Sequence, residues 1–323
     1  MAINREMIDE ARARIAPYVK RTPLEYSQTL SDELCTRVHV KYELFQKTGA
    51  FKARGAFNKI LSLTDEERSR GVVAVSGGNH AQAVAYASNV LGVRSVVLMP
   101  ASTPQNYVDA TREYGAKVEL LPTIAAAFDE IKRYESEGMV FVHPFDDDLV
   151  MAGQGTLGLE IVEDLPQVTD VILSIGGGGL AGGVSTAIKS KNKGVKIWGV
   201  ETVGADAMSQ AIAAGHPVQL DAITSIAKTL GAPSVSDETL SLAKQNLESV
   251  TVVTDAESID ALRFILERLK VLTEPAASCT LAAARTLRSR FGPESNVVLI
   301  LCGGNFSVSD LCRYSAQYGS VSA

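Results

Sequence analysis

The sequence of 323 residues contains few of the residues that bind zinc or cross-link chains. It has four cysteines and four histidines, and no two cysteines form a C-x-x-C pair. This scarcity argues against a Cys/His zinc site and against a disulfide framework, which a chain of this size does not need for a stable core. We therefore expect a reducing, cytoplasmic location.

An excess of positive charge is also absent. The chain has 31 Lys and Arg against 37 Asp and Glu, a net charge of -6, and no long basic run. Nucleic-acid-binding proteins usually carry a basic surface, so nucleic acid is not an expected partner. The hydrophobic fraction of 46% and the charged fraction of 21% are those of a globular protein, which excludes disorder, collagen or coiled coil for the whole chain.

One long stretch, residues 71–93, lacks Asp, Glu, Lys and Arg and has the length of a membrane span. Its centre reads Ser-Gly-Gly-Asn-His-Ala-Gln, and so many polar groups would be costly at mid-membrane. We therefore expect a buried strand, a turn and a buried helix, and no membrane association. The N-terminal residues lack the pattern of a signal peptide, and we expect no regulatory domain after Cys302.

Short apolar runs alternate with helical periodicity along most of the chain. Alternation of this kind predicts an α/β fold with mostly parallel strands, buried on both faces. The expected strands are residues 72–76, 95–99, 117–121, 139–142, 171–175, 195–200 and 297–301, with a further strand ending near Glu43. The expected helices are residues 79–91, 104–114, 124–137, 155–163, 180–189, 205–214, 256–269 and 274–291, together with one that opens near Phe51. Ser102 and Thr103 before Pro104 predict a capped helix start, and Gly115 predicts its end.

The strands fall into two groups separated by the polar stretch 143–148. We expect a smaller domain, residues 68–146, inserted into a larger domain made of residues 1–67 and 147–323.

Lysine and glycine at two expected strand-to-helix turns indicate a ligand. Lys52 stands where a helix opens, and the helix dipole lowers the pKa of such a lysine, as an imine-forming lysine requires. The turn Ser76-Gly77-Gly78-Asn79-His80 offers backbone N–H groups to an anion. Taken locally, an ordinary solvated lysine and a plain turn remain alternatives.

A third turn contains six glycines in eight residues, 176–183, between a strand and a helix. This is the setting of a phosphate cradle. Gly177, Gly179 and Gly182 also satisfy G-x-G-x-x-G, with Glu201 ending the next strand, so a NAD-dependent oxidoreductase is an alternative. That alternative leaves Lys52 and the first glycine turn unexplained.

A fourth group, Cys302-Gly303-Gly304-Asn305, ends the last strand, and Glu274 opens the helix before it. Ligands of open parallel sheets bind at the carboxyl ends of strands, so all four groups can converge there. Cys302 by itself is more typical of a buried structural thiol.

In this order, the blocks 49–56, 76–80 and 176–179 resemble the pyridoxal-phosphate enzymes of fold type II, which share the tryptophan-synthase-β fold. The closest resemblance is to the branch of threonine and serine dehydratases and serine racemases, and it extends from Arg21 to Asn305. It implies two open, mostly parallel twisted sheets flanked by helices, and a homodimer or homotetramer.

The resemblance also implies roles for individual residues. Lys52 would form the Schiff base with the cofactor and move the Cα proton. Phe51 would pack on the pyridine ring, Asn79 would bond its 3-hydroxyl, and Cys302 would face its nitrogen. Further cofactor contacts are implied for Gly176, Gly177, Gly178, Gly179, Leu180 and Glu274, and substrate contacts for Ser76, Gly77, Gly78, Asn79 and His80.

The implied activity is an ammonia-lyase (dehydratase) reaction, in which threonine, serine or phenylserine loses water and yields a 2-oxo acid and ammonia. Serine racemase and hydroxyaspartate dehydratase are alternatives on the same fold. A cysteine-synthase-like β-replacement does not match Ser-Gly-Gly-Asn-His, and the presence of Lys52 argues against a non-catalytic ligand sensor.

Three positions depart from the branch. Racemases have a serine at Gly77 that protonates the opposite face of Cα, so glycine predicts little or no racemisation. Cys302 replaces a usual Ser or Thr, which puts the protonation of the pyridine nitrogen in doubt. Residues 123–128 lack a racemase arginine, which predicts a less polar pocket that would accept phenylserine.

A metal ion often supports this branch, and part of its pattern is present. Glu201 and the Ala205 carbonyl fit that pattern, whereas Ala207 replaces the last acidic ligand. Mg2+, Ca2+ or K+ is therefore an optional expectation, since oxygen ligands suit such ions.

Overall fold

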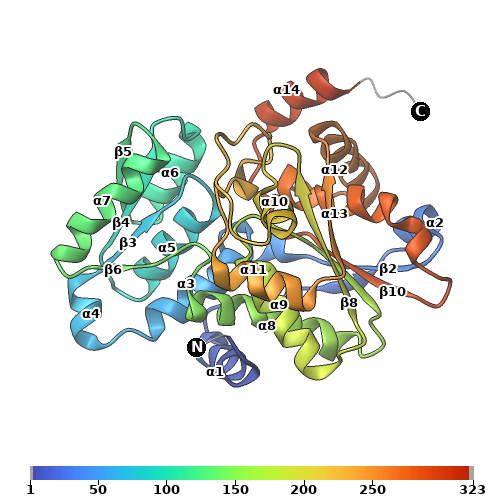
Figure 1. The fold of residues 1–323 in the computed structure, drawn as a ribbon. Coiled ribbons are helices and arrows are strands. Elements are labelled where there is room, and N and C mark those ends of the chain that lie inside the picture. The colour runs from blue at the N-terminus through green and yellow to red at the C-terminus, as the bar shows by residue number, and fades with distance from the viewer. Residues whose placement is uncertain (1–2, 320–323) are drawn as a thin grey trace.

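Two separate sheets organise residues 3–319, the part of the chain that the computed structural model describes (Figure 1). The six-stranded sheet has the order β1-β2-β10-β7-β8-β9, and the four-stranded sheet has the order β5-β4-β3-β6. Every pair is parallel except β1 with β2. The expectation of an α/β fold with two open, mostly parallel sheets is confirmed. The strands are β1 (Leu24–Tyr26), β2 (Arg37–Lys41), β3 (Val72–Val75), β4 (Ser95–Pro100), β5 (Lys117–Leu121), β6 (Val140–Phe141), β7 (Asp170–Ser174), β8 (Lys196–Thr202), β9 (Ser249–Val253) and β10 (Asn296–Ile300).

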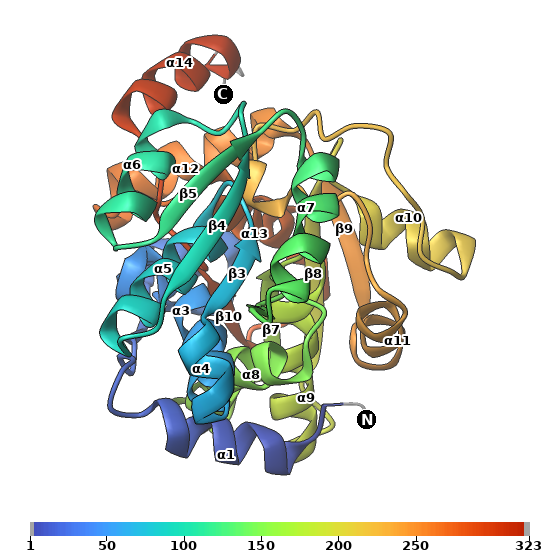
Figure 2. The same ribbon diagram turned by 90° about the vertical axis from the view of Figure 1, so that its left-hand side faces the viewer.

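Helices flank both sheets, as Figures 1 and 2 show. They are α1 (Arg5–Ile15), α2 (Gln28–Leu34), α3 (Lys52–Leu61), α4 (Asp65–Arg70), α5 (Asn79–Val90), α6 (Gln105–Glu113), α7 (Ile124–Ser136), α8 (Asp148–Asp164), α9 (Gly179–Lys191), α10 (Ala207–Ala214), α11 (Asp237–Asn246), α12 (Asp255–Leu269), α13 (Pro275–Thr286) and α14 (Val308–Tyr318). Within the described residues, no helix combines the length and apolar character that a membrane span needs.

Strand β3 shows why the central strands are apolar on both faces. Val72 and Ala74 pack in one hydrophobic cluster with residues of α5, whereas Val73 and Val75 pack in another with residues of α7. Successive side chains of a strand point to opposite faces, so helices on both faces require an unbroken apolar run. Residues 71–93 are therefore a strand, a turn and a helix, as expected.

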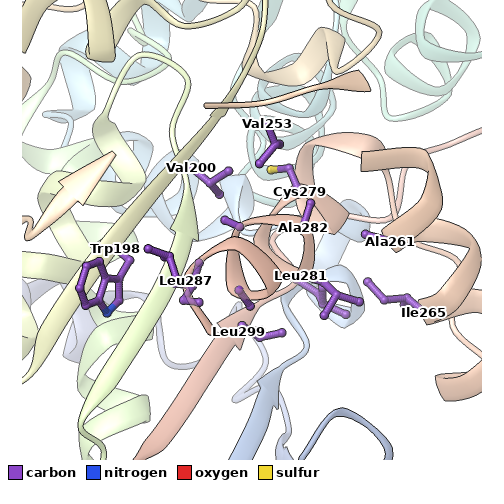
Figure 3. Packing of buried hydrophobic residues seen from close by; sticks show 14 of the residues in the cluster. Trp198, Val200, Val253, Ala261, Ile265, Cys279, Leu281, Ala282, Leu287 and Leu299 are labelled. Carbon is purple, nitrogen blue, oxygen red and sulfur yellow. The ribbon is translucent and has the colours of Figure 1, made fainter. Parts of the chain in front are cut away.

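Helix α13 forms the centre of the core on one face of the six-stranded sheet. Figure 3 shows Cys279 and Leu281 of α13 among strand residues such as Val200 and Leu299, with Ile265 of α12 on the far side. The small residues of α13 let the helix lie close to the sheet. This packing fixes Glu274, the residue that immediately precedes α13, at the sheet's carboxyl edge.

Two predicted helix starts are wrong. Helix α6 begins at Gln105, and Pro104 before it is extended, with φ -56° and ψ 139°, so no side chain caps this helix. The Thr103 N–H instead closes a turn onto the Pro100 carbonyl at 2.9 Å. Helix α8 begins at Asp148 rather than 155, because the Asp147 carboxylate accepts the N–H groups of its first turn.

The four-stranded sheet lies within residues 72–141, and the six-stranded sheet draws strands from both sides of that segment. The division into residues 68–146 and the remainder is compatible with this arrangement and stays a prediction.

Candidate active site

Loops from the two sheets meet beside the start of α3. The Phe51 N–H donates to the Cys302 carbonyl at 3.0 Å, and the Gly304 N–H donates to the Gly49 carbonyl at 2.9 Å. Asn305 extends this link to the four-stranded sheet, because its Nδ2 donates to Asn79 Oδ1 at 2.8 Å. The structure therefore brings together Lys52, the turn 76–80 and the loop after β10, as their positions in the sequence predict.

Lys52 is the first residue of α3 and is half-buried. Its Nζ donates to the Pro144 carbonyl at 2.6 Å and lies 5.2 Å from the centre of the Phe51 ring. No side chain caps α3, so its positive end also acts on the lysine. Burial lowers the pKa of Lys52 to about 8. A lysine in this state supplies a neutral amine near physiological pH, which a nucleophile or a base requires.

The tetraglycine turn leads into α9 and leaves almost no room for side chains. A Cβ on Gly177 would lie 2.1 Å from Cδ1 of Phe145, and one on Gly179 would lie 2.9 Å from the Phe145 Cα. Gly178 has φ +94° and is the last residue before α9, a helix without a side-chain cap. Backbone N–H groups at such a helix start can approach an anion closely, and a phosphate is the anion they suit.

Gly182 and Gly183 lie inside α9 and not in the turn, and they allow other parts of the chain to pack close to this helix. A Cβ on Gly183 would lie 2.3 Å from the Met151 carbonyl oxygen and 2.7 Å from the Gly155 nitrogen. Helix α9 therefore packs against α8 backbone to backbone. The glycine-rich run combines an anion turn with a close helix–helix contact, and only the first four glycines belong to the turn.

Asn79 and Glu274 form a buried polar pair beside Gly303. The Asn79 Nδ2 donates to both carboxylate oxygens of Glu274, at 2.9 and 3.1 Å, and the Thr229 hydroxyl donates to Oε1 at 2.9 Å. Burial raises the pKa of Glu274 to about 7, although these hydrogen bonds oppose the shift. A Cβ on Gly303 would lie 2.7 Å from Glu274 Oε1 and 3.0 Å from Asn79 Nδ2, so a larger residue here would have to displace this pair.

Cys302 follows β10 and is buried among small groups of the six-stranded sheet. Its Sγ lies 3.9 Å from the Ser174 hydroxyl and 3.8 Å from the Ala276 carbonyl oxygen. Burial raises the pKa of the Cys302 thiol well above its ordinary value. The thiol by itself is therefore neutral near physiological pH, and the protonation of the pyridine nitrogen that it would face stays a prediction.

The turn Ser76–His80, for which the resemblance implies substrate contacts, connects β3 to α5. Ser76 Oγ accepts the Gly78 N–H at 3.1 Å, and α5 has no side-chain cap. His80 Nε2 lies 2.8 Å from the Val142 carbonyl oxygen, and burial lowers the His80 pKa to about 3. The ring is therefore neutral and holds the turn in place.

The Glu201 carboxylate is occupied by hydrogen bonds from the protein's own backbone. Its carboxylate accepts the N–H groups of Met208 and Ser209, each at 2.8 Å, at the start of α10. It is thus not placed to bind a ribose, as the NAD alternative requires. Ala205 lies in the adjacent turn, where its N–H donates to the Thr202 carbonyl at 2.8 Å. Residues 3–319 contain no group of three or more His, Cys, Asp and Glu side chains able to hold a metal ion, so the metal site stays a prediction.

The sequence pointed to Asn305 in the group after β10, but it did not single out two other residues that complete this region, Thr229 and Phe145. Thr229 contacts Glu274 from a short 3-10 helix, Lys228–Leu230, and Asn305 fixes the Asn79 amide. Phe145 covers the glycine turn. The contacts of Thr229 and Phe145 arise only from tertiary packing, so no local pattern predicts them.

Comparison with known proteins gives a consistent result. A family model described as "Pyridoxal-phosphate dependent enzyme" matches residues 15–303. An L-threonine ammonia-lyase of Thermotoga maritima is 41% identical over 316 residues, covering 96% of this chain and 78% of the relative. A catabolic L-threonine dehydratase of Staphylococcus aureus is 38% identical over 316 residues, covering 95% and 90%. The solved structure of maize serine racemase superposes with a TM-score of 0.92 at 36% identity, covering 98% of each chain.

Proposed function

We propose a substrate class and a reaction for this chain. The chain belongs to the family of pyridoxal-phosphate dependent enzymes, and it is a lyase of the threonine dehydratase and serine racemase branch of that family. The proposed reaction removes water from a β-hydroxy amino acid and gives a 2-oxo acid and ammonia. The observation that carries the proposal is the Lys52 amine, whose pKa burial lowers to about 8, at the point where the loops of both sheets meet.

The residues at the site fit pyridoxal phosphate. The glycine turn 176–179 before α9 excludes side chains on its crowded face and offers backbone N–H groups for the phosphate. Lys52 supplies the amine, Phe51 an apolar surface, and Cys302 a neutral thiol for the ring nitrogen. When bound, the cofactor supplies the electron sink that makes the Cα proton of an amino acid acidic.

The protein's own residues then orient the substrate and hold its protons. The uncapped start of α5 attracts the substrate carboxylate, since its first N–H groups have no acceptor within the helix. Lys52 Nζ holds the Cα proton, because its lowered pKa leaves part of the amine neutral at pH 7. Glu274 and Asn305 fix the Asn79 amide in one orientation, so that it approaches the ligand without reorganising.

An aromatic wall next to Lys52 supports an apolar substrate side chain. Phe128, Phe141, His143 and Phe145 form a chain of ring contacts, the closest being His143 with Phe145 at 4.7 Å between centroids. Pro144, which accepts the Lys52 hydrogen bond, lies within this wall. Burial lowers the His143 pKa to about 4, so the wall offers no cation to a second carboxylate. We therefore favour threonine, serine and phenylserine over hydroxyaspartate.

A substrate panel tests the proposal. The purified protein is supplied with pyridoxal phosphate and with each stereoisomer of serine, threonine, phenylserine and β-hydroxyaspartate, and ammonia and 2-oxo acid are measured together. Equal amounts of both products from the first three substrates support the proposal. β-Hydroxyaspartate as the best substrate would contradict the apolar pocket, and racemised serine without ammonia would favour the racemase alternative.

Three further expectations of the sequence stay predictions: a homodimer or homotetramer, a cytoplasmic location, and a metal ion near Glu201 and Ala205.

A further inference from the structure

A hydroxyl group occupies the space that the missing side chain of Gly77 would take. A Cβ built on Gly77 would lie 2.6 Å from Oγ1 of Thr103 and 3.5 Å from its Cβ and Cγ2. Gly77 lies in the turn after β3, and Thr103 lies in the loop after β4. These strands are parallel neighbours, with Val75 opposite Leu98, so both loops leave the same edge of the sheet. The hydroxyl of Thr103, from the loop after β4, thus lies where a side chain at position 77, in the turn after β3, would project.

Nothing within the described chain uses this hydroxyl. Thr103 Oγ1 is buried and has no hydrogen-bond partner among residues 3–319. The capping role that the sequence predicts for this position is not performed, since Pro104 precedes α6 in an extended conformation and no side chain caps the helix. Buried polar groups in folded proteins nearly always have a partner, so the unpaired Thr103 hydroxyl next to the turn 76–80 is free to contact a ligand there.

The neighbouring groups indicate which part of a ligand it contacts. Gly77 and Gly78 lead into α5, whose first N–H groups have no acceptor within the helix and no side-chain cap. The positive end of the helix and these donors favour a carboxylate. A threonine hydroxyl can donate a hydrogen bond, so it adds a donor to the same subsite.

We propose that Thr103 is a substrate-binding residue whose Oγ1 donates to the α-carboxylate of the amino acid, in the place that Gly77 leaves open. The proposal rests on the proposed function in one respect, because it takes the ligand to be an amino acid.

Three substitutions of Thr103 test this role by binding rather than by turnover. Thr103→Ser keeps the hydroxyl, Thr103→Val keeps the shape, and Thr103→Ala removes both. L-Alanine, L-serine and L-threonine are titrated into the holoenzyme, and dissociation constants are read from the visible absorption of the cofactor. We expect Thr103→Val to weaken binding about tenfold or more, the effect of losing a hydrogen bond to a charged group, and Thr103→Ser to stay within about threefold of the wild type.

The three ligands share the α-carboxylate, so the loss should be equal for all of them. A loss for serine and threonine but not for alanine would place the hydroxyl at the β-substituent and overturn the proposal, as would unchanged binding by Thr103→Val. Alanine has no β-hydroxyl to eliminate. Its binding therefore tests Thr103 even if no substrate yields ammonia, a result that would reject the proposed function alone.

A second test moves the hydroxyl from the loop after β4 to the turn after β3. Gly77→Ser alone would push its Cβ against Thr103 Oγ1 and should weaken binding of L-alanine. The double variant Gly77→Ser with Thr103→Ala makes room for the new side chain, and it should bind at least about threefold more tightly than Thr103→Ala alone. A double variant no better than Thr103→Ala would overturn the proposal.

Ser88→Ala is the matched control. Ser88 Oγ is also a buried hydroxyl without a partner among the described residues, but it lies near the far end of α5. Its removal should leave the dissociation constants unchanged. An equal loss of binding in Ser88→Ala would mean that Thr103 acts through general packing, and would also overturn the proposal.

Discussion

Two sets of ionisable side chains lie near the start of α3, and only one of them is paired with opposite charges. The paired set, called the ion network here, consists of Lys41, Glu43, Arg54 and Glu160, and each of these charges meets an opposite charge. Arg54 bonds Glu43 at 2.8 Å and Glu160 at 2.6 Å, and Lys41 bonds Glu160 at 2.6 Å. Lys52, two residues before Arg54, has no such partner in the described chain, since its Nζ bonds a backbone carbonyl.

The difference shows in the direction of the pKa shifts. Burial alone would raise the pKa of Glu160, but Arg54 and Lys41 lower it overall, so the carboxylate stays ionised. Lys52 and Glu274 lack ion-pair partners in residues 3–319, and burial brings their pKa values to about 8 and about 7. The ion network fixes the start of α3, and the unpaired groups can change protonation near neutral pH, where proton transfer is useful.

The largest effect is expected from removing the unpaired lysine. Lys52→Ala should lower ammonia release at least a hundredfold and up to about ten-thousandfold, since no other amine at the site can hold the Cα proton. The visible absorption of the bound cofactor should also disappear. Lys59→Ala on the same helix, which loses only an ion pair with Asp147, should keep both activity and absorption. Substantial activity in Lys52→Ala would assign the proton transfer to another group.

The next effect concerns the ion network. Arg54→Met leaves two buried carboxylates facing one lysine, so we expect the free energy of unfolding to fall by about 3–5 kcal/mol. Chemical denaturation of the cofactor-free protein measures this change. Arg54→Met combined with Glu43→Gln leaves the balanced pair of Lys41 and Glu160, and it should recover part of the loss. A cost below about 1 kcal/mol for the single variant would mean that the ion network is not the scaffold we describe.

A smaller effect is expected from Glu274, on the way in which the free energy of unfolding changes with pH. Burial raises its pKa from 4.5 to about 7, so the folded protein prefers the protonated carboxyl. This contribution to stability is complete below about pH 4.5 and is lost as the pH rises through about 7. A shift of about 2.5 pH units corresponds to about 3 kcal/mol. Glu274→Gln should remove that decline, seen as the difference between wild-type and variant unfolding free energies from pH 4.5 to 8. A difference that does not change with pH would contradict the raised pKa.

The sequence predicted those parts of the molecule that depend on short segments. The strands β3, β4, β7 and β10 were found because their runs are apolar and buried on both faces. Strand β9 was missed because it is half-exposed, and β1 because it has only three residues. The start of α8 was missed because Asp147, within a stretch that reads as a connector, is its cap.

Some residues of the site could likewise be predicted from short segments, and others could not. The position of Lys52 follows from one local block, and the glycine turn from another. The hydrogen bond from Thr229 to Glu274 and the ring of Phe145 over Gly177 join segments far apart in the chain, so no local pattern announces them. Thr103 is similar, because its placement against Gly77 depends on the register of two neighbouring strands. Sequence therefore indicates the chemistry of the site, while its shape comes from packing.

The smallest effect is expected at Cys302, and it sharpens the comparison between paired and unpaired groups. Burial holds the thiol neutral, as a hydroxyl would be, so Cys302→Ser should change turnover by less than about threefold and leave the cofactor absorption maximum in place. Cys302→Asp puts a carboxyl at the same position, beside Glu274, and should alter both the absorption maximum and the pH profile of activity. If Cys302→Ser altered both properties while Cys302→Asp behaved like the wild type, the native sulfur would have to be a thiolate, and the site would contain a charge that burial should have removed.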